Sequence, residues 1–199
     1  MPVSKSADTP AQVGGTDLLG DLRVDCYVRS TVPAPLMKAV SSVTERLQHL
    51  QDQGFITESQ ITHWPPEHPA IADADDTREP TRDELVAAFE QWADQHGYTL
   101  EPAFRRKEIP SSPLGLGTDE THERIRVPIV ALALYEDDTE TDPDTELLRG
   151  VVPYTDRSDT GAERTYTVDE WLSTIETDAG EGPTYTFQHE QATLPEEEQ

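Results

Sequence analysis

Cysteine, lysine and long apolar segments are scarce in this chain of 199 residues. The one cysteine, Cys26, excludes an intrachain disulfide and a metal site built from several thiolates. No segment approaches the roughly 18 apolar residues of a membrane-spanning helix. The first residues also lack the apolar core of a signal peptide. We therefore expect a cytoplasmic protein that is neither exported nor embedded in a membrane.

Basic residues are also few, and the imbalance of charge is the strongest signal in the composition. The chain has 40 acidic residues against 15 basic ones, which gives a formal net charge of −25. Self-repulsion of this size destabilises a compact chain in dilute buffer, whereas salt at 1 M screens it by shortening the Debye length to roughly 3 Å. Because the acids are spread along the whole chain, we interpret the sequence as that of a salt-accumulating halophile.

The periodicity of apolar residues predicts an α+β fold. About three helices should pack on one face of a mainly antiparallel, five-stranded sheet. The expected strands lie at 22–28, 55–64, 98–109, 124–135 and 147–154. The first strand should have one polar face, and the apolar run 124–135 should be central despite Pro128. We expect a disordered tail at 1–20, a single domain at 21–177 and an acidic tail at 178–199.

Helix boundaries are marked by residues with clear capping roles. Pro33 suits the first position of a helix, and Gly54 and Gly97 suit positions just past helix ends. Two Thr-x-x-Glu sequences that begin at Thr81 and Thr167 predict capping boxes. The apolar sides of the expected elements should bury Trp92, Leu132 and Trp171.

Five cations are predicted to converge at the ends of two neighbouring strands. They are Arg105, Arg106, Lys107, Arg124 and Arg126. If these strands form a hairpin across the loop 108–122, the cations make a patch that Arg23 and Arg29 could join. Such a patch suits a nucleotide, phosphate, carboxylate or nucleic-acid backbone. Alternatively, nearby acids neutralise it, and the candidates are Glu101, Glu108, Glu120 and Glu123.

The helix 33–53 offers a different hypothesis, because a helix that ends in glycine before two apolar residues resembles the recognition helix of a winged-helix domain. Lys38 and Arg46 would then contact DNA. The exposed face has few cations for phosphate contacts. A helix that simply covers a sheet and stops at Gly54 explains the same pattern.

Signals of catalysis or metal binding are weak. His63, Glu67 and His68 offer zinc ligands in a proline-rich segment, but a fourth ligand is not evident. Cys26 alternates with core residues, which favours a buried, inert thiol. The sequence has no GxSxG, P-loop or HExxH motif. We therefore expect no metal, no cofactor and no enzymatic activity.

Several segments together resemble a known family. They are VDCYVRS, RLQHLQDQGFI, FEQWADQHGYTLEPAFRRKEI, VPIVALALYED, GVVPY and TYTVDEWLSTIE. From Leu22 to Glu176 the chain is similar to short haloarchaeal proteins labelled helix-turn-helix domain proteins, and the resemblance implies a transcriptional regulator. A winged helix has two or three adjacent helices before its hairpin, whereas strands separate the helices expected here.

The favoured function is a non-enzymatic regulatory or binding protein of a halophilic archaeon, with a protein or an anionic ligand as its partner. The first alternative is a winged-helix-like DNA-binding regulator that uses the helix 33–53. The second alternative is an enzyme that acts on an anionic substrate at the Arg/Lys cluster. Nucleic acid is a possible partner but not the favoured one, and a membrane is not expected.

Salt dependence tests the halophile interpretation. Lowering KCl from about 1 M to about 0.1 M lengthens the Debye length to about 10 Å, so repulsion among the acids grows. We expect the melting temperature, followed by far-UV circular dichroism, to fall. A melting temperature independent of salt contradicts the interpretation.

Overall fold

The central element is a four-stranded sheet in the order β2-β1-β6-β7. This computed structural model describes residues 22–67, 80–110, 121–136, 147–157 and 163–180, so the expected N-terminal tail lies outside the described residues. The helices are α1 (Ala34–Asp52), α2 (Arg82–Gln95) and α3 (Val168–Gly180). The strands are β1 (Leu22–Val28), β2 (Glu58–His63), β3 (Tyr98–Thr99), β4 (Arg105–Pro110), β5 (Thr121–Arg126), β6 (Val130–Glu136), β7 (Leu147–Val152), β8 (Tyr154–Asp156) and β9 (Arg164–Tyr166). The predicted α+β class is confirmed.

The expectation of one five-stranded sheet is wrong in detail. β1 pairs in parallel with β2 and antiparallel with β6, and β6 pairs antiparallel with β7. The expected strand 98–109 leaves this sheet and divides into β3, which joins β8 and β9, and β4, which pairs with β5. The expected strand 124–135 also divides, between β5 and β6, at Val127–Ile129. Pro128 lies in this break, where it has no N–H to give to a ladder.

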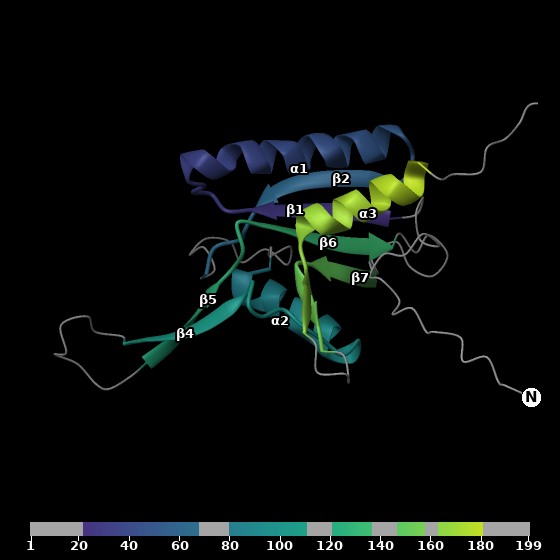
Figure 1. Cartoon of the computed structure of the whole chain (residues 1–199). Coiled ribbons are helices and arrows are strands. Elements are labelled where there is room, and N and C mark those ends of the chain that lie inside the picture. Colours follow the sequence, from purple (N-terminus) through teal and green to yellow (C-terminus); the bar gives the residue numbers. More distant parts are fainter. Residues whose placement is uncertain (1–21, 68–79, 111–120, 137–146, 158–162, 181–199) are drawn as a thin grey trace, which may run out of the picture.

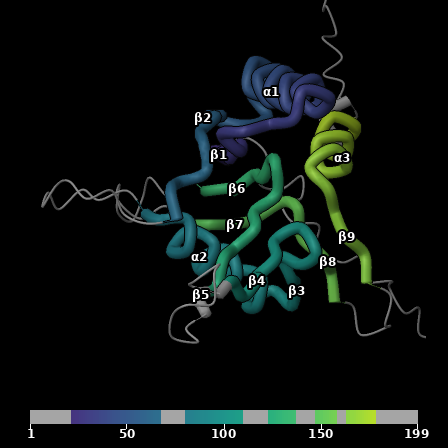
Figure 2. The backbone as a smooth tube through the Cα atoms, turned by 90° about the vertical axis from the view of Figure 1, so that its left-hand side faces the viewer, coloured from purple at the N-terminus to yellow at the C-terminus, as the bar shows by residue number. Residues whose placement is uncertain are grey.

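Helices cover both faces of the central sheet, not one as expected. Figures 1 and 2 show α1 and α3 on one side and α2 on the other. β1 is therefore buried on both faces, and the polar face expected for it is wrong: Asp25 is 7% exposed and Tyr27 packs edge-on against Phe89 of α2. Residues two apart share a face of a strand, so Val24 and Cys26 face α1 and α3.

The predicted caps of α2 and α3 and the glycines after α1 and α2 are confirmed by hydrogen bonds and backbone angles, whereas Pro33 is the N-cap of α1 and not its first residue. At α2, the Glu84 N–H donates to the Thr81 hydroxyl, and the Thr81 N–H donates to the Glu84 carboxylate. The same exchange joins Thr167 and Glu170 at the start of α3. Gly54 and Gly97 follow α1 and α2 with φ of 77° and 75°, where L side chains are strained.

Four aromatic rings bind the central sheet to α2 and to the start of β4. Trp64, just after β2, stacks on Tyr27 of β1 with ring centroids 5.1 Å apart. Phe104 meets Trp64 edge-on at 5.9 Å and Phe89 of α2 at 6.4 Å. All four rings are buried. This aromatic cluster (Tyr27, Trp64, Phe89 and Phe104) fixes four separate backbone segments beside one another.

The predicted burial of three large side chains is confirmed. Trp92 is 4% exposed, Leu132 is 0% exposed and Trp171 is 5% exposed. None of the helices in the described ranges has the length and apolar character needed to cross a lipid bilayer.

Trp92→Ala tests the packing of α2. The Trp92 ring packs against Tyr98 and Tyr154, and its indole N–H donates to the Arg149 carbonyl at 3.1 Å. We expect the substitution to lower the free energy of unfolding by about 3–5 kcal/mol, measured by urea denaturation at constant salt. A loss below about 1 kcal/mol contradicts this packing.

Candidate functional site

β4 and β5 form the antiparallel hairpin that the sequence predicted. Arg105 lies opposite Arg126, and Lys107 lies opposite Arg124. Because residues two apart on a strand share a face, all four cations project from one face of this β4–β5 ribbon. We call this the cationic face. Figure 1 shows that the ribbon extends away from the central sheet.

The opposite face of the ribbon carries two of the four acids predicted to neutralise the cations, whereas Glu101 precedes β4 and Glu120 lies outside the described residues. Glu108 and Glu123 are opposite each other there, beside Arg106 and Ile125. The Arg106 guanidinium forms ion pairs with Glu123 at 2.8 Å and with Glu90 of α2 at 2.5 Å. Hydrogen bonding to Glu90 raises the pKa of Arg106 above its usual value. These bonds tie the ribbon to α2 and leave the cationic face without either acid.

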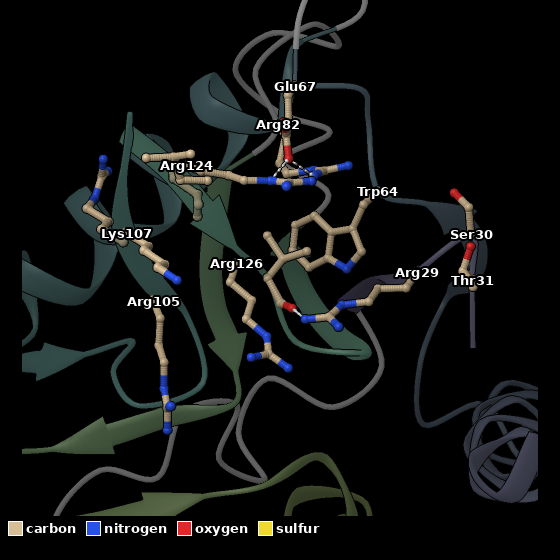
Figure 3. Close-up of a pocket in the computed structure, with 14 residues that line it drawn as sticks. Arg29, Ser30, Thr31, Trp64, Glu67, Arg82, Arg105, Lys107, Arg124 and Arg126 are labelled. Atoms are coloured by element: carbon tan, nitrogen blue, oxygen red, sulfur yellow. Dashed lines mark hydrogen bonds and ion pairs between the residues drawn. The ribbon is translucent and has the colours of Figure 1, made fainter. Parts of the chain in front are cut away.

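A pocket of about 770 Å³ lies between the cationic face and the segments that follow β1 and β2. It is lined by seven basic residues, which are Arg29, Arg82, Arg105, Arg106, Lys107, Arg124 and Arg126. These are seven of the 15 basic residues in the chain, whereas one acid, Glu67, lines the pocket among the described residues. Figure 3 shows the Arg29 side chain reaching toward Arg126, and burial together with the charge of Arg126 lowers the pKa of Arg29.

The aromatic cluster positions these charges through the backbone. Phe104 directly precedes Arg105, and Tyr27 lies two residues before Arg29. Trp64 lines the pocket itself while its indole N–H donates to the Pro128 carbonyl at 3.2 Å. Packing of apolar rings therefore places cations close together that would otherwise separate by mutual repulsion.

One carboxylate holds one end of the pocket. Glu67 Oε1 accepts hydrogen bonds from Arg82 and from Arg124, each at 2.9 Å (Figure 3). The Arg82 Nε–H also donates to the Pro65 carbonyl at 3.1 Å, so this arginine is fixed at the start of α2. Two guanidinium groups thus share a single negative charge.

The other end of the pocket remains strongly positive. The Arg29 guanidinium donates to the Val127 carbonyl, and the Arg105 Nε–H donates to the Pro102 carbonyl at 3.0 Å. Carbonyls orient these arginines without cancelling their charge. Burial lowers the pKa of Arg29, and the nearby charges of Arg126 and Arg82 lower it further. Arg29 therefore lies in a positive electrostatic field.

Sequence reasoning found part of this arrangement. The five predicted cations all line the pocket, and Arg29 joins them as suggested. Arg23 does not, because it bonds to Asp25 near the other end of β1 and lies over the Tyr135 ring. Arg82 and Glu67 were missed as members of this site, because the tertiary fold alone brings α2 and the segment after β2 to the ribbon.

The two DNA-contact candidates on α1 have different surroundings. Lys38 is exposed in the N-terminal half of the helix. Arg46 instead bonds to two acids of α3, Glu176 at 2.7 Å and Asp169 at 2.6 Å, and its side chain is 21% exposed. Arg46 therefore connects α1 to α3, and its guanidinium is already occupied.

The residues considered as a nucleophile or as zinc ligands have other surroundings. Burial raises the pKa of the Cys26 thiol to about 12. His63 contacts the Val28 carbonyl through its ring Nδ1, Glu67 binds the two arginines, and His68 lies outside the described residues. Across the ranges that the structure covers, no three His, Cys, Asp or Glu side chains are grouped to hold a metal ion.

Comparison with known protein families shows the family of the chain. A family model described as a helix-turn-helix domain matches residues 16–180, so the chain belongs to this family. No curated protein matches the chain. The family is compatible with a regulatory or DNA-binding role. In the fold itself, β2 separates α1 from α2 along the chain, and β3 to β9 separate α2 from α3.

Arg126→Ala tests whether the cationic face is energetically unfavourable in the free protein. Like charges directly opposite each other on paired strands destabilise a sheet by about 0.2–1 kcal/mol. We expect the substitution to leave the free energy of unfolding unchanged or to raise it by up to about 1 kcal/mol, measured by urea denaturation. Arg106→Ala on the other face is the control, and we expect it to lower stability by about 0.5–1 kcal/mol because it loses two partly exposed ion pairs. Marked destabilisation by Arg126→Ala would mean that the native protein already neutralises this residue.

Proposed function

We propose that this member of the helix-turn-helix domain family is a non-enzymatic regulatory protein of a halophilic archaeon that binds an anionic ligand in its cationic pocket. The observation that carries the proposal is the concentration of cations there. Seven of the 15 basic residues in the chain line this pocket. The chain has 40 acids, yet Glu67 is the one acid that lines the pocket among the described residues.

The register of the ribbon supports binding over simple charge balance. Arg105 opposite Arg126 and Lys107 opposite Arg124 are repulsive pairs, and the two nearest acids on the ribbon point to its other face. A bound anion would turn this repulsion into attraction, since each guanidinium can donate two parallel hydrogen bonds to a phosphate or carboxylate. The pocket volume of about 770 Å³ suits a small molecule of the size of a metabolite.

The chemistry of the lining favours binding over catalysis. Arginine stays protonated in proteins and cannot act as a general base. The carboxylate of Glu67 already accepts from Arg82 and Arg124. The side chains of this pocket can therefore hold and orient negative charge, which is what a sensor of an anionic ligand requires.

DNA binding by the ribbon is a second candidate, and the shape of the ribbon favours it. A two-stranded ribbon can enter the major groove of DNA, and the β4–β5 ribbon extends from the sheet with its cations on one face (Figure 1). This candidate differs from recognition by α1, where Arg46 is bound to Glu176 and Asp169.

Isothermal titration at constant, high KCl tests the proposal and separates the candidates. The wild-type protein is titrated with a panel of nucleotides, sugar phosphates and dicarboxylates, and separately with duplex DNA. We expect saturable binding of a small anion. Replacing Arg124 and Arg126 together by alanine should weaken it by at least about tenfold, because each lost charged hydrogen bond costs about 1.5–3 kcal/mol.

A charge-matched control removes two cations elsewhere. Replacing Lys38 and Arg164 together by alanine removes two positive charges, as the Arg124 and Arg126 double variant does. Both residues lie outside the pocket. Binding should survive in this control. If both double variants lose affinity alike, the effect is one of net charge and not of the pocket. Saturable binding of duplex DNA alone would favour the second candidate, and no binding of any anion would refute the proposal.

A further inference from the structure

Three arginines of the cationic pocket also line a second, smaller cavity. This cavity has a volume of about 280 Å³, and Arg29, Arg105 and Arg126 line both spaces. Its other lining residues are Pro102, Ala103, Pro128 and Ile129, so no acid of the described chain contributes to its wall. The arginine triad (Arg29, Arg105 and Arg126) therefore lies where the two cavities adjoin.

Two of the three arginines are oriented by backbone carbonyls, and none of the three is neutralised. Arg29 and Arg105 each donate to a backbone carbonyl, of Val127 and Pro102 respectively, which fixes their side chains and leaves further N–H donors on each guanidinium. Within the described ranges, no ion pair joins any of the three arginines to a carboxylate.

The opposite end of the pocket shows how this protein neutralises arginine where it does so. There, Arg82 and Arg124 share the one carboxylate of Glu67. If one negative charge neutralises two guanidinium groups, three guanidinium groups require a ligand with more than the single charge of a carboxylate. A phosphomonoester carries about −1.5 to −2 charges at neutral pH and presents three strong acceptor oxygens.

We propose that the arginine triad is the subsite for the phosphate of a small phosphomonoester, whose organic part lies in the larger cavity. This proposal rests on the proposed function and names the class of its ligand. The Arg126 side chain comes from β5 and the Arg29 side chain from the residue directly after β1 (Figure 3). Apolar walls from Trp64, Ile109 and Val127 are available to the organic part.

Phosphodiesters suit the subsite less well for reasons of charge and shape. An internal phosphodiester carries one charge, and substituents on two of its oxygens leave fewer acceptors for three guanidinium groups. The linkages of a nucleic-acid backbone are of this kind. A free phosphomonoester and the terminal phosphate of a nucleic acid share the required chemistry, so the experiment must distinguish these two sources.

The test compares ligands on the wild-type protein by isothermal titration at constant ionic strength. The probes are a nucleoside monophosphate, a sugar phosphate and a cyclic nucleotide of the same base, which is a matched phosphodiester. Short DNA with and without a terminal phosphate forms the second arm. We expect at least one phosphomonoester to bind at least tenfold more tightly than the cyclic nucleotide. A terminal phosphate on DNA should add less affinity than a free phosphomonoester shows.

Two variants connect this selectivity to the triad. Arg126→Lys keeps the charge but loses the planar fork of donors, so it should weaken phosphomonoester binding about tenfold while it changes cyclic-nucleotide binding little. Arg164→Ala, on β9 and outside both cavities, is the control and should bind like the wild type. Circular dichroism checks that each variant is folded. The comparison of ligands on the wild-type protein does not depend on the folding of any variant.

The outcomes separate this proposal from the one on which it rests. Equal binding of the phosphomonoesters and the cyclic nucleotide would overturn the phosphomonoester assignment and leave a general anion pocket. Selective binding that Arg126→Lys does not change would overturn the triad as its subsite. Binding only of nucleic acid, with or without a terminal phosphate, would overturn the small-molecule ligand. Failure of every anion to bind would refute the proposed function itself.

Discussion

Packing of buried aromatic rings against one another is the interaction on which the pocket depends. Tyr27, Trp64, Phe89 and Phe104 come from four separate places in the chain and meet in one cluster. Burying such a side chain contributes about 1.5–3 kcal/mol, and a ring pair adds about 0.5–1.5 kcal/mol. Repulsion between facing cations on paired strands amounts to about 0.2–1 kcal/mol. The cluster is therefore strong enough to hold the neighbouring arginines together against their mutual repulsion.

Local patterns in the sequence predicted local structure well. The capping boxes at Thr81 and Thr167, the glycines after α1 and α2, and the pairing of β4 with β5 all follow from residue types at short spacing. The division of 124–135 into two strands did not follow, because the apolar run continues through Pro128 and gives no sign that β5 belongs to another sheet. The sequence did not predict that α2 covers the second face of the central sheet. Asp25 made that face of β1 appear polar, whereas the Asp25 side chain is buried.

The site itself was predictable only where its members are close in sequence. The basic run Arg105 to Lys107 and the nearby pair Arg124 and Arg126 stand out in an acidic chain. Arg82 is the first residue of α2, and Glu67 lies in a proline-rich segment, so neither carries a local mark of its role. Arg46 shows the reverse: it stands on a helix face that suggested DNA contact, yet long-range bonds to Glu176 and Asp169 assign it to packing between α1 and α3.

The parallel pairing of β1 and β2 has a consequence for how such a protein can diverge. Ser30 and Thr31 follow the carboxyl end of β1, and Glu67 follows that of β2, so part of one wall of the pocket consists of residues outside the strands. The hydrogen bonds between strands join backbone groups, so they do not depend on the side chains beyond the strand ends. Exchange of Ser30, Thr31 or Glu67 can therefore alter which ligand is accommodated while the central sheet is inherited unchanged. Substitutions at these three positions would therefore change the ligand that the pocket selects while the cations that attract negative charge stay in place.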